Sequence, residues 1–259
     1  MSLETYIITG ASSGIGRAAA LLLAQKGANV AIVDIQDGAA EETARESLRA
    51  GAHGARAYHC DVTDEAEVAE TIDRVQTELG APAGLFANAG IDRGGLLHEL
   101  PLETWQSVIQ TNLTGIYLTC KHVLQAMIDT GNGGSIVCTS SPGGFVAFAA
   151  GGAGAYSASK GGISSLIRCM AVDYARYGIR VNGIVPGPTE TPLMWANVPE
   201  AERDGIRQVV QAETPLGRLA DPIEPARAVV WLLSDDASYV TGSHLVCDGG
   251  VLAKASLSV

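Results

Sequence analysis

Short runs of apolar and β-branched residues alternate with long amphipathic segments along almost the entire chain. The runs lie near 5–9, 29–34, 55–60, 84–88, 134–140, 179–185 and 243–247. This alternation is typical of repeated strand–helix–strand units with parallel strands. Val30-Ala31-Ile32-Val33 is continuously apolar, which predicts a strand that helices cover on both faces. We therefore expect an α/β fold with one doubly wound (Rossmann) parallel sheet of about seven strands and helices on both faces.

No internal boundary interrupts this pattern, so we expect one domain over residues 1–259. Hydrophobic residues make up 47% of the chain and charged residues 17%, and no linker, charge block or repeat divides it. One segment, 189–212, breaks the alternation after the sixth run and carries Leu193, Met194, Trp195 and Val198. We predict that this segment forms a substrate lid, although the same spacing also suits a short buried helix.

The charge and cysteine patterns restrict the partners of the chain. Its formal net charge is −11 and it has no Lys/Arg cluster, which argues against nucleic acid or an anionic membrane as a partner. No apolar run approaches the roughly 18 residues of a membrane span, and no basic leader precedes the first run. The cysteines form no C-x-x-C pair and the histidines no H-x-x-x-H pair, so we expect free thiols and no metal. We predict a cytoplasmic protein that acts on a small molecule.

A glycine-rich turn links the first predicted strand to the first predicted helix. Gly10, Gly14 and Gly16 permit a tight turn and a close approach of the backbone to a ligand. The helix that follows offers unpaired N–H groups and a partial positive charge to a pyrophosphate. On the glycines alone, a tight turn without a ligand is an equal alternative.

Asp34 favours the nucleotide interpretation. It ends the second predicted strand, where a carboxylate can accept hydrogen bonds from the adenosine ribose hydroxyls. A 2′-phosphate would meet like charge there, and neither Ser13 nor Ile35 supplies a cation, so we predict NAD as the cofactor. Asp61, which follows the third predicted strand, could contact adenine together with Val62 or mark the start of the next helix.

Tyr156 and Lys160 stand four residues apart in Tyr-Ser-Ala-Ser-Lys. On a helix this spacing puts both side chains on one face, roughly 5–6 Å apart at Cβ. A nearby ammonium lowers the pKa of a phenol from its ordinary value of about 10. The pair therefore predicts a proton-transfer device, and the alternative is an ordinary helical tyrosine beside a surface lysine.

Taken in order along the sequence, these motifs resemble those of the classical short-chain dehydrogenase/reductase family. The resemblance covers essentially the whole chain and rests on the glycine signature Thr9–Gly16 (TGxxxGxG), Asp34, Asn88-Ala89-Gly90, Asn112, Ser141, Tyr156, Lys160 and Pro186-Gly187. One clear departure is the long insert 142–155 between the serine and the tyrosine, so the resemblance assigns no substrate.

The resemblance implies a role for each of the four catalytic candidates. Tyr156 would act as general acid/base toward the substrate oxygen, and Lys160 would lower its pKa and hold the nicotinamide ribose. Ser141, rather than its neighbour Ser140, would hydrogen-bond the substrate oxygen. Asn112 would support a water-linked proton path from Lys160, and together with Gly115 it interrupts an otherwise apolar helical pattern.

The remaining candidates divide between the cofactor and the substrate. The cofactor residues that we predict are Gly10, Ser12, Ser13, Gly14, Ile15, Gly16, Asp34, Ile35, Asp61, Val62, Asn88, Ala89, Gly90, Tyr156, Lys160, Pro186, Gly187, Thr189 and Thr191. The substrate residues that we predict are Ser141, Gly143, Tyr156, Leu193, Met194 and Trp195. Thr189 is the expected main-chain donor to the carboxamide, because Pro188 has no N–H. Asp92 and Arg93 are not assigned, because charges in loops are usually solvated.

These predictions lead to an NAD-dependent oxidoreductase that interconverts a secondary alcohol and a ketone. The resemblance also implies a homotetramer, and NAD favours oxidation of the alcohol. Two alternatives stay open: an NADPH-dependent 3-oxoacyl-thioester reductase, and a regulator that senses the dinucleotide without turnover.

Overall fold

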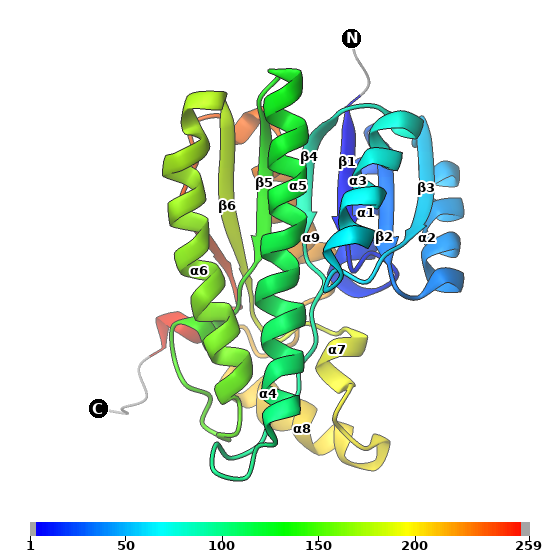
Figure 1. The fold of residues 1–259 in the computed structure, drawn as a ribbon. Helices are drawn as coiled ribbons and strands as arrows, with labels where there is room; N and C mark the ends of the chain where they lie inside the picture. Colours follow the sequence, from blue (N-terminus) through cyan, green and yellow to red (C-terminus); the bar gives the residue numbers. More distant parts are fainter. Residues whose placement is uncertain (1–3, 255–259) are drawn as a thin grey trace.

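The computed structural model describes residues 4–254 and places seven parallel strands in one sheet (Figure 1). The strands are β1 (Thr5–Thr9), β2 (Asn29–Asp34), β3 (Gly54–His59), β4 (Pro82–Ala87), β5 (Gly134–Thr139), β6 (Ile179–Pro186) and β7 (His244–Cys247). Their order across the sheet is β3-β2-β1-β4-β5-β6-β7. The predicted α/β fold with a doubly wound parallel sheet is therefore confirmed, and each predicted strand end lies within two residues of the observed one.

The order of the strands reverses direction at β1. The chain builds β2 and β3 on one side of β1, and then crosses to add β4 on the other side. The connections after β1 and β4 consequently leave the sheet toward opposite faces, which opens a crevice beyond the carboxyl ends of these two strands. Gly10 follows β1 and Asn88 follows β4, so both lie at this crevice.

Helices cover both faces of the sheet. On one face lie α1 (Gly14–Gln25), α2 (Asp37–Ala50) and α9 (Ile223–Leu233), and on the other lie α3 (Glu65–Leu79), α5 (Gly115–Thr130) and α6 (Gly154–Tyr174). The short helix α4 (Leu102–Ile109) leads into α5, and α7 (Pro192–Trp195) and α8 (Glu200–Glu213) lie beyond the carboxyl ends of the strands (Figure 1).

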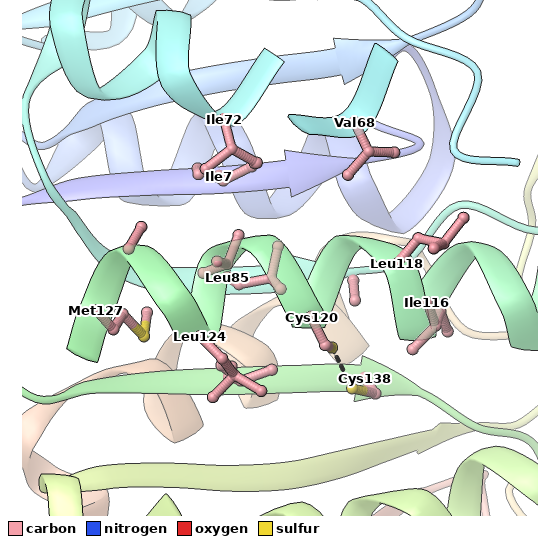
Figure 2. Close-up of a cluster of buried hydrophobic side chains, with 14 of the residues drawn as sticks. Ile7, Val68, Ile72, Leu85, Ile116, Leu118, Cys120, Leu124, Met127 and Cys138 are labelled. Atoms are coloured by element: carbon pink, nitrogen blue, oxygen red, sulfur yellow. Dashed lines mark hydrogen bonds between the residues drawn. The ribbon is translucent and has the colours of Figure 1, made fainter. Parts of the chain in front are cut away.

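Alternation along the strands divides the core between the two faces. In β1, Ile7 packs against the face of α3 and α5, whereas Ile8 packs against the face of α1 and α9. Figure 2 shows the first of these clusters, in which Ile72 of α3 lies over the sheet. Cys120 of α5 and Cys138 of β5 meet in the same cluster, with 3.9 Å between their Sγ atoms. This packing fixes the strands whose ends carry the site.

A π-helical turn, η1 (Gln110–Thr114), separates α4 from α5. Asn112 lies inside this turn and is fully buried. Gly115 follows it, and a Cβ at this position would lie 2.7 Å from Cγ2 of Val62. The predicted interruption of the helix therefore has two causes, since the turn widens at Asn112 and the helix passes close against Val62 of the neighbouring loop.

Three further observations concern membrane-spanning helices, cysteines and metal ligands in the described part of the chain. Between residues 4 and 254 no helix combines the length and hydropathy needed to cross a bilayer. All five cysteines lie in this range and are free thiols. Within the same range, no group of three or more His, Cys, Asp or Glu side chains is arranged to hold a metal ion.

Candidate active site

A cavity of about 840 Å³ opens beyond the carboxyl ends of the strands. Residues that follow each of the seven strands contribute to its wall. The predicted residues that line it are Gly10, Ser12, Ser13, Gly14, Ile15, Asp34, Ile35, Asp61, Val62, Asn88, Ala89, Gly90, Ser141, Tyr156, Lys160, Pro186, Gly187, Thr189, Thr191, Leu193 and Met194. Four predicted residues do not line it, namely Gly16, Asn112, Gly143 and Trp195.

The glycine turn between β1 and α1 has the backbone geometry of a phosphate site. Gly10 and Gly14 adopt left-handed φ angles of +63° and +55°, which favour glycine. Gly16 does not line the cavity, but a Cβ there would lie 2.2 Å from the Gly10 carbonyl oxygen, so the turn closes only around a glycine. Ser13 is the N-cap residue of α1, but its side chain makes no capping hydrogen bond, and no acidic residue lies in the first turn of the helix. The first N–H groups of α1 are therefore open to an anion in the cavity.

The Asp34 carboxylate holds the turn from the end of β2. Its Oδ2 accepts a hydrogen bond from the Ser12 N–H at 2.9 Å, and its Oδ1 accepts one from the Gln36 N–H at 3.0 Å. Asp34 is 8% exposed and still lines the cavity. Each carboxylate oxygen has a second lone pair, so the group can accept further hydrogen bonds from a ligand.

Basic side chains are absent from the segments of cavity wall that flank Asp34. The basic residues that line the cavity are Arg93 and Lys160, which belong to other parts of the wall. Arg17, one turn into α1, forms an ion pair with Glu46 of α2 instead. The surroundings of Asp34 therefore offer no free cation to a 2′-phosphate.

Asn88 ties the strand ends together at the crevice. Its Nδ2 donates to the carbonyl oxygens of Thr9 and Gly10, each at 3.2 Å. Its Oδ1 accepts a hydrogen bond from the Thr139 hydroxyl at 3.0 Å. The amide thus joins the ends of β1, β4 and β5, and the Asn-Ala-Gly segment lines the cavity from this fixed position.

Asp61 lines the cavity but does not cap the helix after it. Its Oδ1 accepts hydrogen bonds from both the backbone and the hydroxyl of Thr63. The cap of α3 is Asp64, whose side chain accepts from the N–H groups of Ala66 at 2.8 Å and Glu67 at 3.1 Å. Asp61 therefore stabilises a turn next to the cavity, and Asp64 caps the start of α3.

Tyr156 and Lys160 lie one turn apart on α6 and share the cavity wall. The Lys160 Nζ is 5.6 Å from the centroid of the Tyr156 ring and donates to the Thr139 carbonyl oxygen at 2.8 Å. Burial raises the pKa of Tyr156 to about 12, and the interaction with Ser141 lowers it only in part. Burial also lowers the pKa of Lys160 to about 8.

The expected fall in the Tyr156 pKa is therefore not produced by the protein groups alone. Lys160 faces the ring and a carbonyl oxygen, and desolvation of the phenolate dominates at Tyr156. The spacing of the two residues correctly predicted their meeting, but spacing carries no information about how deeply the pair is buried. Within the protein, the phenol keeps its proton at neutral pH.

The two adjacent serines have different surroundings. Ser140 Oγ lies 2.8 Å from Ser164 Oγ and is 1% exposed, so it ties β5 to α6. Ser141 Oγ accepts a hydrogen bond from the Gly143 N–H at 3.2 Å. The Ser141 hydroxyl also hydrogen-bonds the Tyr156 phenol and lowers its pKa. The hydroxyl beside the phenol therefore belongs to Ser141, as expected from the sequence.

Asn112 lies behind the cavity and holds one of its loops. Its Nδ2 donates to the Ile91 carbonyl oxygen at 2.9 Å, and its Oδ1 accepts from the Ile91 N–H at 2.8 Å. The same Nδ2 lies 3.2 Å from Oγ of Ser159 on α6. These contacts make Asn112 a positioning residue for the loop after β4, and its part in a water-linked proton path stays a prediction.

Two residues predicted to contact the substrate lie outside the cavity wall. Gly143 packs beneath the ring of Phe148, where an added Cβ would lie 2.9 Å from the ring, and Phe148 lines the cavity in its place. Trp195 is 7% exposed, and its Nε1 donates to Oε1 of Glu190 at 2.7 Å. The guanidinium carbon of Arg207 lies 5.0 Å from the centre of the Trp195 ring. Trp195 therefore joins α7 to α8, and its predicted place in the pocket wall was wrong.

Asp92, which was left unassigned from the sequence, lines the cavity, and so does Phe148 of the insert 142–155. Their segments are joined, because the Gly95 N–H donates to the Gly152 carbonyl oxygen at 2.8 Å. Asp92 had a usable signal, since it follows β4 just as the other site residues follow their own strands. The apolar character of Phe148 also favours a place in a pocket wall, but the path of the insert 142–155 depends on its partner loop.

The chain is similar to known dehydrogenases over almost its whole length. A family model described as enoyl-(acyl carrier protein) reductase matches residues 10–252. The cis-4-hydroxycyclohexanecarboxylate dehydrogenase of Sinomonas cyclohexanicum is 45% identical over 248 residues, which cover 95% of this chain and 96% of the relative. The 2,5-dichloro-2,5-cyclohexadiene-1,4-diol dehydrogenase of Sphingobium indicum is 40% identical over 255 residues, which cover 98% of each chain.

A solved structure has the same fold. The crystal structure of a short-chain type dehydrogenase/reductase from Mycobacterium marinum matches with a TM-score of 0.90 at 35% sequence identity. The match covers 97% of this chain and 96% of that chain. The similarity therefore includes the sheet, both helical layers and the strand ends that form the cavity.

Proposed function

Because the chain belongs to the classical short-chain dehydrogenase/reductase family of oxidoreductases, we propose that it oxidises a secondary alcohol to a ketone with NAD⁺. The family uses a nicotinamide dinucleotide. The observation that carries the proposal is the convergence of Tyr156, Lys160 and Ser141 in one cavity whose wall also contains Asp34. When bound, NAD⁺ supplies the acceptor for the hydride that leaves the alcohol carbon.

The residues of the cavity fit a dinucleotide. The open N–H groups of α1 and the close turn at Gly10 suit a pyrophosphate, and Asp34 suits the ribose hydroxyls. Among residues 4–254 the Thr189 N–H donates to no protein acceptor, so it is available to a carboxamide as predicted. Asp34 and its lack of cationic neighbours support NAD over NADP.

The chemical roles follow from the positions of three side chains. Ser141 donates to the substrate oxygen and holds it beside the Tyr156 phenol. In the oxidation, Tyr156 must first release its own proton to solvent and then accept the hydroxyl proton as a phenolate. Ser141 lowers the pKa of Tyr156, and the Lys160 ammonium, 5.6 Å from the centre of the ring, would stabilise the phenolate charge. In the reverse reaction Tyr156 donates its proton, and the raised pKa keeps that proton in place until transfer.

A cyclic alcohol is the substrate class that we propose. Two of the relatives are named for ring alcohols, and a third, from an Acinetobacter strain, is a cyclohexanol dehydrogenase with 37% identity. The wall of the cavity agrees with such a substrate, because Phe148, Leu193 and Met194 give it an apolar surface for a ring.

Three further proposals follow the sequence predictions. We propose that the single domain works as a homotetramer in the cytoplasm. We also propose that segment 189–212 closes over the substrate as a lid. Its internal contact of Trp195 with Arg207 would keep α7 and α8 together as they move.

The proposed function is tested by the formation of reduced cofactor with a panel of cyclic and open-chain secondary alcohols, with NAD⁺ and NADP⁺ compared on each. We expect turnover with NAD⁺, and Tyr156→Phe should lower kcat about 10²–10⁴-fold because the general base is lost. Tyr117→Phe is the matched control, since Tyr117 lies on α5, is 47% exposed and does not line the cavity.

The same panel, extended by a 3-oxoacyl thioester with NADH and with NADPH, separates the alternatives. A strong preference for NADPH together with reduction of a 3-oxoacyl thioester would replace this proposal with the thioester reductase. Binding of NAD⁺ by calorimetry without turnover of any alcohol, and without an effect of Tyr156→Phe, would favour the dinucleotide sensor.

A further inference from the structure

The carboxylate of Asp92 lies at the reacting end of the cavity without a protein partner. The residue follows the Asn-Ala-Gly-Ile segment after β4, is half-buried and lines the cavity. Among residues 4–254 its carboxylate oxygens form no hydrogen bond or ion pair, and Asp92 accepts a hydrogen bond only at its backbone carbonyl oxygen. A half-buried carboxylate favours a hydrogen-bond donor, and here the ligand is the group that can bring one.

Two neighbours hold the backbone at this position. Asn112 bonds both the N–H and the carbonyl oxygen of Ile91, the residue before Asp92. Asn197, in the segment between α7 and α8, donates from Nδ2 to the carbonyl oxygen of Asp92 itself. The carboxylate is therefore presented from a fixed loop, which is the arrangement that selective recognition requires.

The charge of Asp92 is felt by the catalytic pair. Burial raises the pKa of Asp92, and the Lys160 ammonium acts in the opposite direction. Asp92 in turn raises the pKa of both Tyr156 and Lys160. Asp92, Tyr156 and Lys160 also line the same cavity, so the carboxylate is near enough to the catalytic pair to reach the same substrate.

The charges around Asp92 limit the chemistry of its ligand. An anionic substituent would meet the carboxylate itself. An ammonium substituent would be repelled by Lys160 and by the neighbouring Arg93, which also lines the cavity. A hydroxyl group can donate a hydrogen bond to the carboxylate without either repulsion.

We propose that Asp92 accepts a hydrogen bond from a second hydroxyl group of the substrate, so that the chain prefers cyclic diols to the matching mono-alcohols. This inference rests on the proposed alcohol oxidation and narrows its substrate class. One hydroxyl group lies between Ser141 and Tyr156, and the other lies at Asp92. The ring between them contacts the apolar part of the wall that includes Phe148.

The preference has a calculable size. A mono-alcohol that fills the cavity covers the Asp92 carboxylate and removes water from it without supplying a donor. A hydrogen bond to a charged group then favours the diol by about 10–100-fold in kcat/KM. Because Asp92 is only half-buried, water can still reach part of its carboxylate, so a preference of about 100-fold in kcat/KM is the upper limit.

The test compares kcat/KM for the isomeric cyclohexanediols and for cyclohexanol with NAD⁺, in the native protein and in three variants. Asp92→Ala should lower the ratio of the best diol to cyclohexanol about 10–100-fold while the value for cyclohexanol is kept or rises. Asp92→Asn retains a hydrogen-bond acceptor but not the charge, so its diol-to-cyclohexanol ratio should lie between those of the native protein and Asp92→Ala. This variant replaces Asp92→Ala in the test if the alanine variant does not fold. Glu99→Gln is the control, because Glu99 lies in the same loop, is exposed and does not line the cavity.

Each outcome decides the matter. A native protein that shows no diol preference, or variants at Asp92 that leave the ratio unchanged, would overturn this inference while alcohol oxidation stands. Faster turnover of an aminocyclohexanol than of the diols would also overturn it, because the carboxylate would then serve an ammonium group. If the native protein binds NAD⁺ and oxidises neither alcohol, the proposed function fails and this inference fails with it.

Discussion

Removal of the Asp34 carboxylate should relax the cofactor preference and loosen the glycine turn at the same time. The Ser12 N–H, bonded to Oδ2 at 2.9 Å, is buried, whereas the Gln36 N–H belongs to an exposed residue and can bond to water instead. Asp34→Ala therefore leaves one buried donor without a partner, which costs about 1–3 kcal/mol of stability.

The effect on the cofactor follows from the charge. Two like charges 4 Å apart repel by roughly 4 kcal/mol at an effective dielectric constant of 20 and by about 1 kcal/mol in bulk water. Asp34 lies between these limits, since it is 8% exposed but borders an open cavity. We therefore expect Asp34→Ala to raise kcat/KM for NADP⁺ relative to NAD⁺ about 10–100-fold.

Three measurements check this prediction: kcat/KM with both cofactors on one alcohol, their dissociation constants by calorimetry, and unfolding in urea. Asp34→Asn removes the charge but keeps an acceptor, so it should relax the preference with a smaller loss of stability. Asp37→Ala is the control, because Asp37 is exposed, pairs with His59 at 2.7 Å and does not line the cavity. An unchanged NAD⁺/NADP⁺ ratio in both Asp34 variants would refute the assignment of cofactor choice to this carboxylate.

Two further predictions concern the catalytic lysine and the glycine turn. The pKa of Lys160 is about 8 in the folded protein and about 10.4 in the unfolded chain. Between these two pH values the unfolded chain binds more protons than the folded protein. The free energy of unfolding therefore rises with pH across this window, by roughly 3 kcal/mol. Lys160→Met should abolish this rise in urea unfolding curves; an unchanged pH dependence would contradict the buried charge. Gly16→Ala should cost about 1–3 kcal/mol and weaken NAD⁺ binding in thermal-shift assays, because its Cβ would meet the Gly10 carbonyl oxygen. Gly38→Ala, with no atom within 4 Å of the added Cβ, should be neutral or slightly stabilising, and equal effects of the two changes would refute the close-approach argument.

Local patterns in the sequence were enough to predict the sheet and most of the cavity wall. The apolar runs set the strands to within two residues, because the period of side-chain burial in a covered strand is a local property. Parallel connection then brings all carboxyl ends to one edge of the sheet, so Gly10, Asp34 and Asn88 could be expected together.

Spacing also predicted that Tyr156 and Lys160 would meet, but not the direction in which the phenol pKa moves. That direction depends on burial, which raises the Tyr156 pKa to about 12, and burial is produced by segments distant in the sequence. The same holds for Trp195, whose apolar character suited a pocket wall but whose position was decided by Glu190 and Arg207.

The sequence by itself thus determined the order of strands and helices, the glycine turn and the identity of the reacting side chains, because each is written in residues close together in the chain. Only the tertiary structure decided what Ser140 and Asn112 hold and that Asp92 enters the cavity. These outcomes depend on contacts between residues far apart in the sequence. Such contacts form only when whole elements pack, so no local pattern records them.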